Sequence, residues 1–267
     1  METVFFSDLE KKDVVVGFSK RNMQHHRGIA GLKYYLIVMF FRKHVQTFGE
    51  VTFSLNQLLT ECGYSTNTHN KSMYDDFRKI IKNEILDKGY ATSNQDILAV
   101  VPSELYTLVL SKKQNIFFTA DNFVQISMYE YEAIVNQCTG RTNKSVVLGV
   151  LMFIKQYIFT DSNFIQIAYP SKQQIRNGVG VSSITTVESA IKILVDLELI
   201  YIRTDLYVAD IMDRDVFVPA RNVFAIDQKH LIGNAVINEL GNFYGREVCN
   251  KQDVDGKTRF LKKQKED

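Results

Sequence analysis

Two long apolar segments divide the sequence into halves that look alike. The first covers residues 34–41 and the second residues 146–154. A helix that is apolar on every side is buried in a protein core or in a membrane. Because both segments are far shorter than the roughly 20 residues that a membrane span needs, the pattern predicts two buried core helices.

A short motif follows each apolar segment with the same internal spacing. Residues 54–58 read Ser-Leu-Asn-Gln-Leu and residues 63–65 read Gly-Tyr-Ser, whereas residues 171–175 read Ser-Lys-Gln-Gln-Ile and residues 180–182 read Gly-Val-Ser. The two copies are offset by 117 residues, since 171 − 54 = 117. Self-similarity with a domain-sized period indicates two copies of one structural unit.

Each copy has the sequence chemistry of a helix-turn-helix. A serine caps a short helix, a glycine in the left-handed conformation ends it, and a further capping residue starts the second helix. In the second copy these residues are Ser171, Gly180 and either Ser182 or Ser183. We expect the second helix of this copy over residues 184–197.

Steps of about 100° per residue divide the second helix of each copy into a core face and an outward face. In the second copy the predicted core face holds Val187, Ala190, Ile191 and Leu194, and the outward face holds Thr185, Ser189, Lys192 and Asp196. In the first copy the corresponding helix is expected over residues 71–88, with Met73, Phe77, Ile80 and Ile81 inward and Lys71, Ser72, Lys79 and Lys82 outward.

Segments rich in β-forming residues after each helix-turn-helix predict a wing, which is a strand, a polar tip and a return strand. The second wing is expected to pair residues 199–204 with residues 206–208. The first wing is expected to pair residues 90–92 with residues 97–101.

Three further segments complete the outline. Residues 111–115 are polar and are typical of a linker, and residues 123–127 are expected to form a strand that opens the second copy. An apolar stripe over residues 227–243 predicts a helix that either packs on the second domain or pairs with a partner.

The predicted fold class is mainly α with small β-hairpins (α+β), arranged as two winged helix-turn-helix domains in tandem. The expected parts are an N-terminal arm (1–30), a first winged-helix domain (31–112), a second winged-helix domain (113–226) and a C-terminal helix with a charged tail (227–267).

Patterns of catalytic or metal-binding residues do not occur in the sequence. No glycine-rich loop ends in Gly-Lys-Ser/Thr, no Gly-x-Ser-x-Gly elbow occurs, and no histidine has a second ligand at the i, i+4 spacing. The cysteines, Cys62, Cys138 and Cys249, are odd in number and far apart, which favours neither a disulfide framework nor a zinc site. Because these patterns are missing, we expect a protein that is not an enzyme and has no cofactor. We expect it to be cytoplasmic, because the first residues lack the pattern of a secretory signal.

The second copy carries the clearest resemblance to a known family. Residues 170–175 read Pro-Ser-Lys-Gln-Gln-Ile and residues 180–187 read Gly-Val-Ser-Ser-Ile-Thr-Thr-Val. On these residues the copy resembles bacterial winged helix-turn-helix DNA-binding domains. The first copy, over residues 53–101, matches more loosely.

Tandem winged helices of this kind are similar to replication initiators and replisome organisers of bacterial plasmids, integrative elements and phages. The resemblance implies sequence-specific binding to double-stranded origin DNA. It also implies recruitment of host replication proteins, such as a helicase or its loader.

Two departures from the family pattern weaken base-specific readout. Such domains often read Gly-Val-Ser-x-x-Thr-Val, whereas here one more residue lies between Ser182 and Thr186. Many relatives place an arginine just before the threonine, whereas this chain has no basic residue between Ser183 and Lys192. Readout of guanine by arginine is therefore not evident, and serine and threonine contact phosphates or bases less selectively.

The overall charge is too small to hold DNA by itself. The chain has 32 Lys and Arg residues against 30 Asp and Glu residues, a formal net charge of +2, so affinity for DNA must come from the local arrangement of charge. The candidate DNA contacts are hydroxyl, amide and basic side chains of both motifs. They are Lys172, Ser182, Ser183, Thr185, Thr186, Ser189, Lys192 and Arg203 in the second copy, and Thr66, Asn67, Asn70, Lys71, Ser72, Lys79 and Lys82 in the first.

Two other functions stay open at this stage. A transcriptional regulator would use the same DNA-binding chemistry, and an adaptor would use its winged helices to dock proteins instead of DNA, because a fold does not fix a function. The sequence also does not decide whether the protein forms a homodimer.

Overall fold

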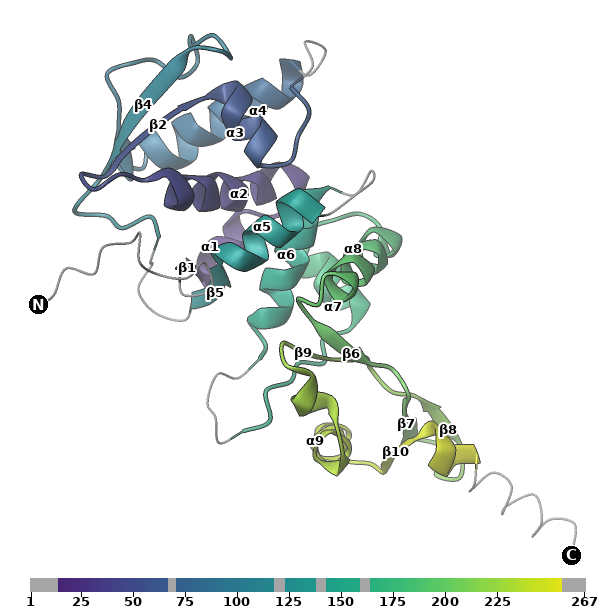
Figure 1. The fold of residues 1–267 in the computed structure, drawn as a ribbon. Helices are drawn as coiled ribbons and strands as arrows, with labels where there is room; N and C mark the ends of the chain where they lie inside the picture. Colours follow the sequence, from purple (N-terminus) through teal and green to yellow (C-terminus); the bar gives the residue numbers. More distant parts are fainter. Residues whose placement is uncertain (1–13, 67–70, 118–122, 138–142, 159–163, 256–267) are drawn as a thin grey trace, which may run out of the picture. The chain divides into compact units, whose positions relative to one another are not determined.

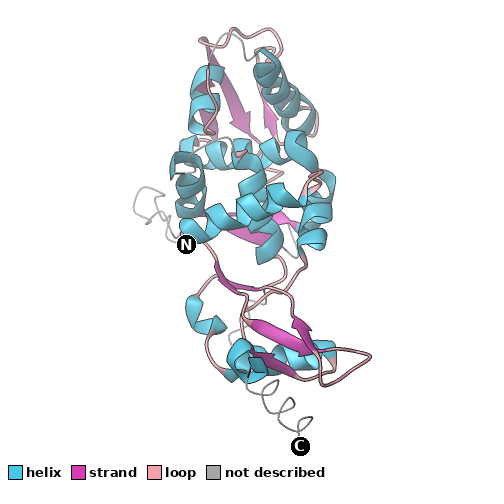
Figure 2. Cartoon of the chain, turned by 90° about the vertical axis from the view of Figure 1, so that its right-hand side faces the viewer, coloured by secondary structure: helices cyan, strands magenta, loops and turns pink. Residues whose placement is uncertain are grey.

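The computed structural model describes residues 14–66, 71–117, 123–137, 143–158 and 164–255 (Figure 1). The chain is a mixture of α and β, about half of it helical. Its strands are short, form antiparallel sheets of two or three strands, and are scattered among the helices (Figure 2). This confirms the mixed fold class that the sequence predicts.

The chain forms two compact units. The first unit combines the described residues up to Gln156 with Ile175–Leu197. The second unit combines the described residues of Tyr157–Gln174 with those from Glu198 onward. The predicted domain boundaries at residues 30, 112 and 226 separate the repeat copies along the sequence and stay a prediction.

The first half of the chain begins with a strand and two helices and continues with a helix pair and a hairpin. Its elements are β1 (Val15–Ser19), α1 (Lys20–His25), α2 (Gly28–His44), β2 (Glu50–Ser54), α3 (Leu55–Glu61), α4 (Lys71–Ile80), the π-helix η2 (Ile81–Leu86), β3 (Ala91–Thr92) and β4 (Leu105–Leu110).

The second half has a similar order of elements, with an isolated bridge at Ala168 in place of β2, and then continues further. Its elements are β5 (Phe123–Ser127), α5 (Met128–Gln137), α6 (Lys144–Lys155), α7 (Lys172–Val179), α8 (Ile184–Asp196), β6 (Tyr201–Arg203), β7 (Leu206–Ala209), β8 (Phe217–Pro219), β9 (Val223–Ala225), the 3-10 helix η3 (Gln228–Leu231), α9 (Asn234–Tyr244) and β10 (Val248–Asn250).

Strand pairing repeats together with the order of elements. In the first half, β4 lies between β2 and β3. In the second unit, β9 pairs with β6, and Phe224 of β9 also forms a bridge with Ala168, which precedes α7 as β2 precedes α3. The internal repeat found in the sequence therefore extends to the pairing of the strands that follow each helix pair.

The two long apolar segments lie at the centre of the first unit. Every residue is buried over residues 32–41 of α2 and over residues 145–154 of α6, and the two helices contact each other. β1 pairs with β5 along its whole length, from Val15 opposite Ser127 to Ser19 opposite Phe123. This confirms the prediction of two buried helices and of a strand over residues 123–127.

None of the helices in the described residues is long and apolar enough by itself to cross a membrane. Only α7 and α8 taken together have the necessary length and composition, and the chain bends by 98° between them.

The second unit has its own apolar core. Its buried members are Ile167, Leu206, Val208, Val223, Ala225, Leu231, Val236, Leu240 and Val248. Val236 and Leu240 of α9 belong to this core, so that part of the apolar stripe predicted over residues 227–243 packs within the protein, whereas Ile232 and Phe243 are exposed. The helix begins at Asn234 and not at residue 227, because Gly233 has a positive φ of 81° and separates it from η3.

The predicted return strand of the first wing is wrong. The strand that returns is β4, whereas residues 97–99 form a turn and residues 100 and 101 are not in a strand. The carboxylate of Asp96 accepts a hydrogen bond from the Leu98 amide at 3.0 Å, while Ile97 and Val100 are buried. A local turn fixed by Asp96 therefore replaces the extended backbone that the β-forming residues favoured.

The predicted pairing of the second wing is also wrong. β6 pairs with β9, whereas β7 pairs with β8 and β10. β7 buries Leu206 and Val208 in the core of the second unit, so the chain does not reverse at Asp205 but continues into a longer hairpin.

Candidate nucleic-acid interface

The turn between α7 and α8 has the capping chemistry that the sequence predicts. Ser171 Oγ accepts a hydrogen bond from the Gln174 amide at 3.1 Å, and the Ser171 amide donates to Gln174 Oε1 at 2.8 Å. This reciprocal pair is a capping box. At the start of α8, Ser183 Oγ accepts from the Thr185 amide at 3.1 Å, so Ser183 is the cap and Ser182 is not.

Gly180 is required at the end of α7 by conformation and by space. Its φ is +78°, the left-handed region that glycine adopts without cost. A Cβ atom at this position would lie 2.7 Å from the Gly28 amide nitrogen and 2.8 Å from the Cβ of Arg27. The turn that leads into α8 is therefore packed directly against the first residues of α2.

The two faces of α8 agree with the helical spacing. The four predicted core residues, Val187, Ala190, Ile191 and Leu194, are buried, and the four predicted outward residues, Thr185, Ser189, Lys192 and Asp196, are exposed. The exposed side also includes the carboxylate of Glu188. The outward face thus combines hydroxyl groups with one ammonium group and two carboxylates.

In the first half, α4 is the helix that corresponds to α8. Lys71, Ser72 and Lys79 are exposed on it, while Tyr74 and Phe77 are buried. The predicted single helix over residues 71–88 is wrong in its second part, because α4 ends at Ile80 and the π-helix η2 follows.

Buried polar contacts hold α4 in place. Lys33 of α2 is 3% exposed, and its Nζ donates to Asp76 Oδ2 at 2.6 Å. Arg78 donates to Asp75 Oδ1 at 3.1 Å and to the Val100 carbonyl oxygen at 2.7 Å. The charges of Lys33 and Arg78 are therefore paired within the protein.

The far end of this helix region is anchored by a buried histidine. The His26 ring stacks on Tyr34 with centroids 4.1 Å apart, and its Nε2 lies 3.6 Å from Glu84 Oε2 of η2. Burial lowers the pKa of His26 to about 4, although the nearby Glu84 carboxylate opposes this shift. His26 is therefore neutral at pH 7 and acts as a packing group between α2 and η2.

The structure brings most candidate residues together within their own motif. Ser182, Ser183, Thr185, Thr186, Ser189 and Lys192 lie on or just before α8, and Lys71, Ser72 and Lys79 lie on α4 with Lys82 following in η2. Lys82 is half-buried and forms an ion pair with Asp87. Ser183 and Thr186 are half-buried, and the other residues of this set are exposed.

The remaining candidates are placed differently. Thr66 is exposed, and its carbonyl oxygen accepts from the Tyr74 hydroxyl at 3.2 Å. Lys172 is exposed at the start of α7. Asn67 and Asn70 lie outside the described residues.

Arg203 makes its contacts inside the second unit. Its guanidinium donates to Asp205 Oδ1 at 2.9 Å and to the carbonyl oxygens of Leu231 and Gly233 at 3.0 and 3.2 Å. These contacts hold the connection between η3 and α9. Its assignment as a DNA contact stays a prediction.

Sequence reasoning missed Arg221, a basic residue beside α7. It precedes β9, its guanidinium donates to Gln174 Oε1 at 3.2 Å, and it lies over the Phe243 ring at 5.2 Å. Gln174 is part of the capping box of α7. Only the pairing of β9 could have revealed this neighbour, because Arg221 is 47 residues from Gln174 along the chain.

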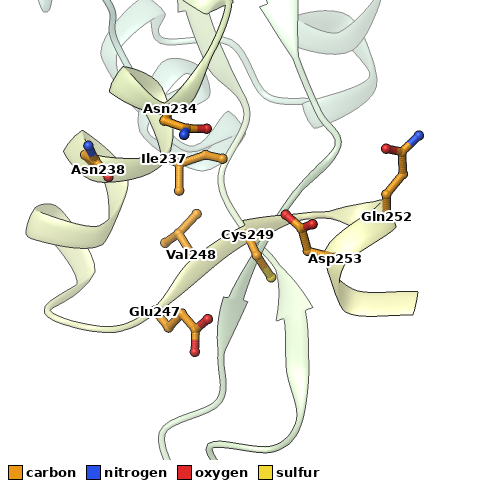
Figure 3. Close-up of a pocket in the computed structure, with 8 residues that line it drawn as sticks. All are labelled: Asn234, Ile237, Asn238, Glu247, Val248, Cys249, Gln252 and Asp253. Carbon is orange, nitrogen blue, oxygen red and sulfur yellow. The ribbon is translucent and has the colours of Figure 1, made fainter. Parts of the chain in front are cut away.

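A separate pocket lies in the second unit between α9 and β10, with a volume of about 540 Å³ (Figure 3). Its lining includes Asn234, Asn238, Glu247, Cys249 and Asp253. Among the residues that line it there is no histidine and no basic side chain. Within the described ranges of the chain, no group of three or more His, Cys, Asp or Glu residues could hold a metal ion.

The chain matches no protein-family model, and no curated protein is similar to it in sequence.

Proposed function

We propose that the protein is a tandem winged helix-turn-helix protein that binds double-stranded DNA. The observation that carries this proposal is α8, a helix that is capped at Ser183, buried on one face and exposed on the other with Thr185, Ser189 and Lys192. The bend of 98° between α7 and α8 is that expected of a helix-turn-helix. In each half an antiparallel pair of strands follows the two helices, β3 with β4 in the first half and β6 with β9 in the second, and these pairs support a wing in each half.

The exposed groups of α8 suit the major groove of DNA. The helix has 13 residues, a length of about 20 Å, and a helix fits the groove, which is about 12 Å wide. The ammonium group of Lys192 would contact a phosphate, and the hydroxyls of Thr185 and Ser189 would contact phosphates or base edges. Glu188 and Asp196 would repel phosphates, which limits how the helix can enter the groove.

The first half supports the same function through a more basic helix. Lys71 and Lys79 are exposed on α4, while Asp75 and Asp76 are paired with Arg78 and Lys33. Two contact surfaces on one chain raise affinity by making the second contact intramolecular.

We further propose that this DNA is the replication origin of a mobile element, to which the protein recruits host replication proteins such as a helicase or its loader. This step rests on the resemblance of residues 170–187 to winged-helix domains and on the tandem arrangement. A transcriptional regulator would have the same DNA-binding surface and differs only in where its sites lie.

The adaptor function has one observation in its favour. The outward face of α8 carries two carboxylates, Glu188 and Asp196, against the single ammonium group of Lys192. Counterion release needs basic contacts, so a face of this charge is also suited to a protein partner.

Selection of bound genomic fragments separates these functions. Full-length protein is mixed with sheared DNA from the organism and from its mobile elements, and the retained fragments are sequenced. We expect enrichment of a segment with repeated short sites near the gene for this protein. Enrichment of promoters would instead favour the regulator, and an absence of any enriched fragment would contradict DNA binding.

A further inference from the structure

The hairpin of β7 and β8 ends in a tip with an unusual composition. Residues 210–216 read Asp-Ile-Met-Asp-Arg-Asp-Val and connect Ala209 to Phe217, which face each other across the two strands. Within this tip Ile211 is 76% exposed and Met212 is 93% exposed. Two adjacent large apolar side chains therefore stand in water at the end of an ordered hairpin.

Hydrogen bonds within the tip fix its backbone. The Asp210 amide donates to the Val216 carbonyl oxygen at 2.8 Å, and the Val216 amide donates to the Asp213 carbonyl oxygen at 3.1 Å. The carboxylates of Asp210 and Asp213 accept from the amides of Met212 and Asp215 at 2.8 and 3.0 Å. Because the backbone is already ordered, docking of Ile211 and Met212 would cost little further entropy.

The charge of the tip disfavours DNA as its ligand. Three aspartates and one arginine give residues 210–216 a net charge of −3 + 1 = −2. Such a tip is repelled by DNA phosphates and by an anionic membrane surface. The apolar pair needs an apolar cavity, and the aspartates select one that is bordered by cations.

The described pocket of a second copy does not meet this requirement. The pocket between α9 and β10 is lined by Glu247 and Asp253 and has no basic residue in its lining (Figure 3). It would repel the tip of another copy, so this pocket does not match the tip.

We propose that residues 210–216 form a docking tip for a partner protein that has an apolar pocket bordered by lysine or arginine side chains. Ile211 and Met212 are the anchors that enter the pocket, and Asp213 and Asp215 pair with its basic border. This interaction does not require the DNA-binding function, because the tip shares no residue with the exposed faces of α4 and α8.

The test begins by finding the partner and ends with a measured affinity. A photo-crosslinking residue, p-benzoylphenylalanine, replaces Met212 in the full-length chain, which is irradiated in an extract of the cells that carry the gene. The matched control has the same residue at Ile232, which is 68% exposed in the same unit. A protein crosslinked only at position 212 is then purified, and its binding to the unlabelled full-length chain is measured at several salt concentrations.

Two double variants separate the apolar anchors from the charge. Changing Ile211→Ser with Met212→Ser should weaken binding by about tenfold or more, as for central anchors of an interface. Changing Asp213→Asn with Asp215→Asn should weaken binding and flatten its salt dependence, because it removes two negative charges. The tip should keep its backbone, because an Asn at position 213 can still accept from the amide of residue 215. DNA affinity should be unchanged in all of these variants, so this result is independent of the proposed DNA-binding function.

Several results would overturn the docking tip. These are crosslinking at position 212 to DNA, to lipid or to a second copy, crosslinking to no protein, and crosslinking to the same proteins at position 232. Equal affinity of the purified partner for the wild-type chain and for the Ile211→Ser, Met212→Ser variant would overturn it as well.

Discussion

Gly180 is the residue on which the turn into α8 depends most directly. It has a positive φ, and a Cβ atom there would lie 2.7 Å from the Gly28 amide nitrogen. We expect Gly180→Ala to lower the free energy of unfolding by about 2 kcal/mol or more, because backbone strain and a backbone clash add. Gly233→Ala is the matched control, since Gly233 has a φ of +81° with nothing within 4 Å of its would-be Cβ, and it should cost about 1 kcal/mol. Equal losses in chemical denaturation would contradict this role for the Gly180 contact.

His26 makes the stability of the protein depend on pH. Its pKa in the folded chain is about 4, because burial disfavours the charged ring, whereas an exposed histidine has a pKa of about 6.5. The unfolded chain therefore binds a proton more readily, so the stabilisation is complete above about pH 6.5 and is lost as the pH falls towards 4.

His26→Phe keeps a ring against Tyr34 but cannot take up a proton. We expect the wild-type chain to lose about 1–3 kcal/mol more of its free energy of unfolding between pH 7 and pH 4.5 than this variant does. Thermal unfolding of both proteins across this range measures the difference. The same pH dependence in the two proteins would show that His26 does not titrate as described.

At the scale of elements, only one of two adjacent serines caps the start of α8. Ser183 Oγ accepts from the Thr185 amide, whereas Ser182 is exposed before the cap. Ser183→Ala should lower the free energy of unfolding by about 1 kcal/mol through loss of the cap. Ser182→Ala should change it by less than about 0.5 kcal/mol, as for an ordinary surface position. Reversed effects would place the cap at Ser182.

Helices of the repeat could be predicted from the sequence because their signals are local. The serine caps, the left-handed glycines and the spacing of Val187, Ala190 and Leu194 all lie within a few residues of the helix that they define. The faces of α8 followed from the same spacing, and with them the exposed candidates Thr185, Ser189 and Lys192.

The pairing of the strands could not be predicted in the same way, because the paired strands are distant in the sequence. β1 lies in the predicted N-terminal arm (1–30), and its pairing with β5 shows that it is a strand. The return strand β4 and the partner of β6 were missed for the same reason. The π-helix η2 keeps the apolar positions of a helix, so periodicity alone could not show where α4 ends.

At the scale of the whole molecule, the two halves of the repeat are connected within the first unit. β1 pairs with β5, and α2 packs against α6, although the exposed residues 112–115 link the halves. Limited proteolysis should cut first near Lys112 and Lys113. The two fragments should still elute together in size-exclusion chromatography, because the cut removes neither the shared sheet nor the packed helices. Fragments that separate without denaturant would contradict this account of the first unit.

The central claim is that the protein binds double-stranded DNA through the exposed face of α8. Fluorescence anisotropy of a labelled duplex, titrated with the full-length chain at several salt concentrations, tests it most directly. We expect log K to fall linearly with log salt, and Lys192→Ala to reduce the slope by about one because it removes one phosphate contact. Lys229→Ala, which removes an exposed lysine paired with Asp227 in the second unit, should leave the slope unchanged. No binding at about 50 mM salt, or unchanged binding when Thr185, Ser189 and Lys192 are all replaced by alanine in a folded chain, would contradict the claim.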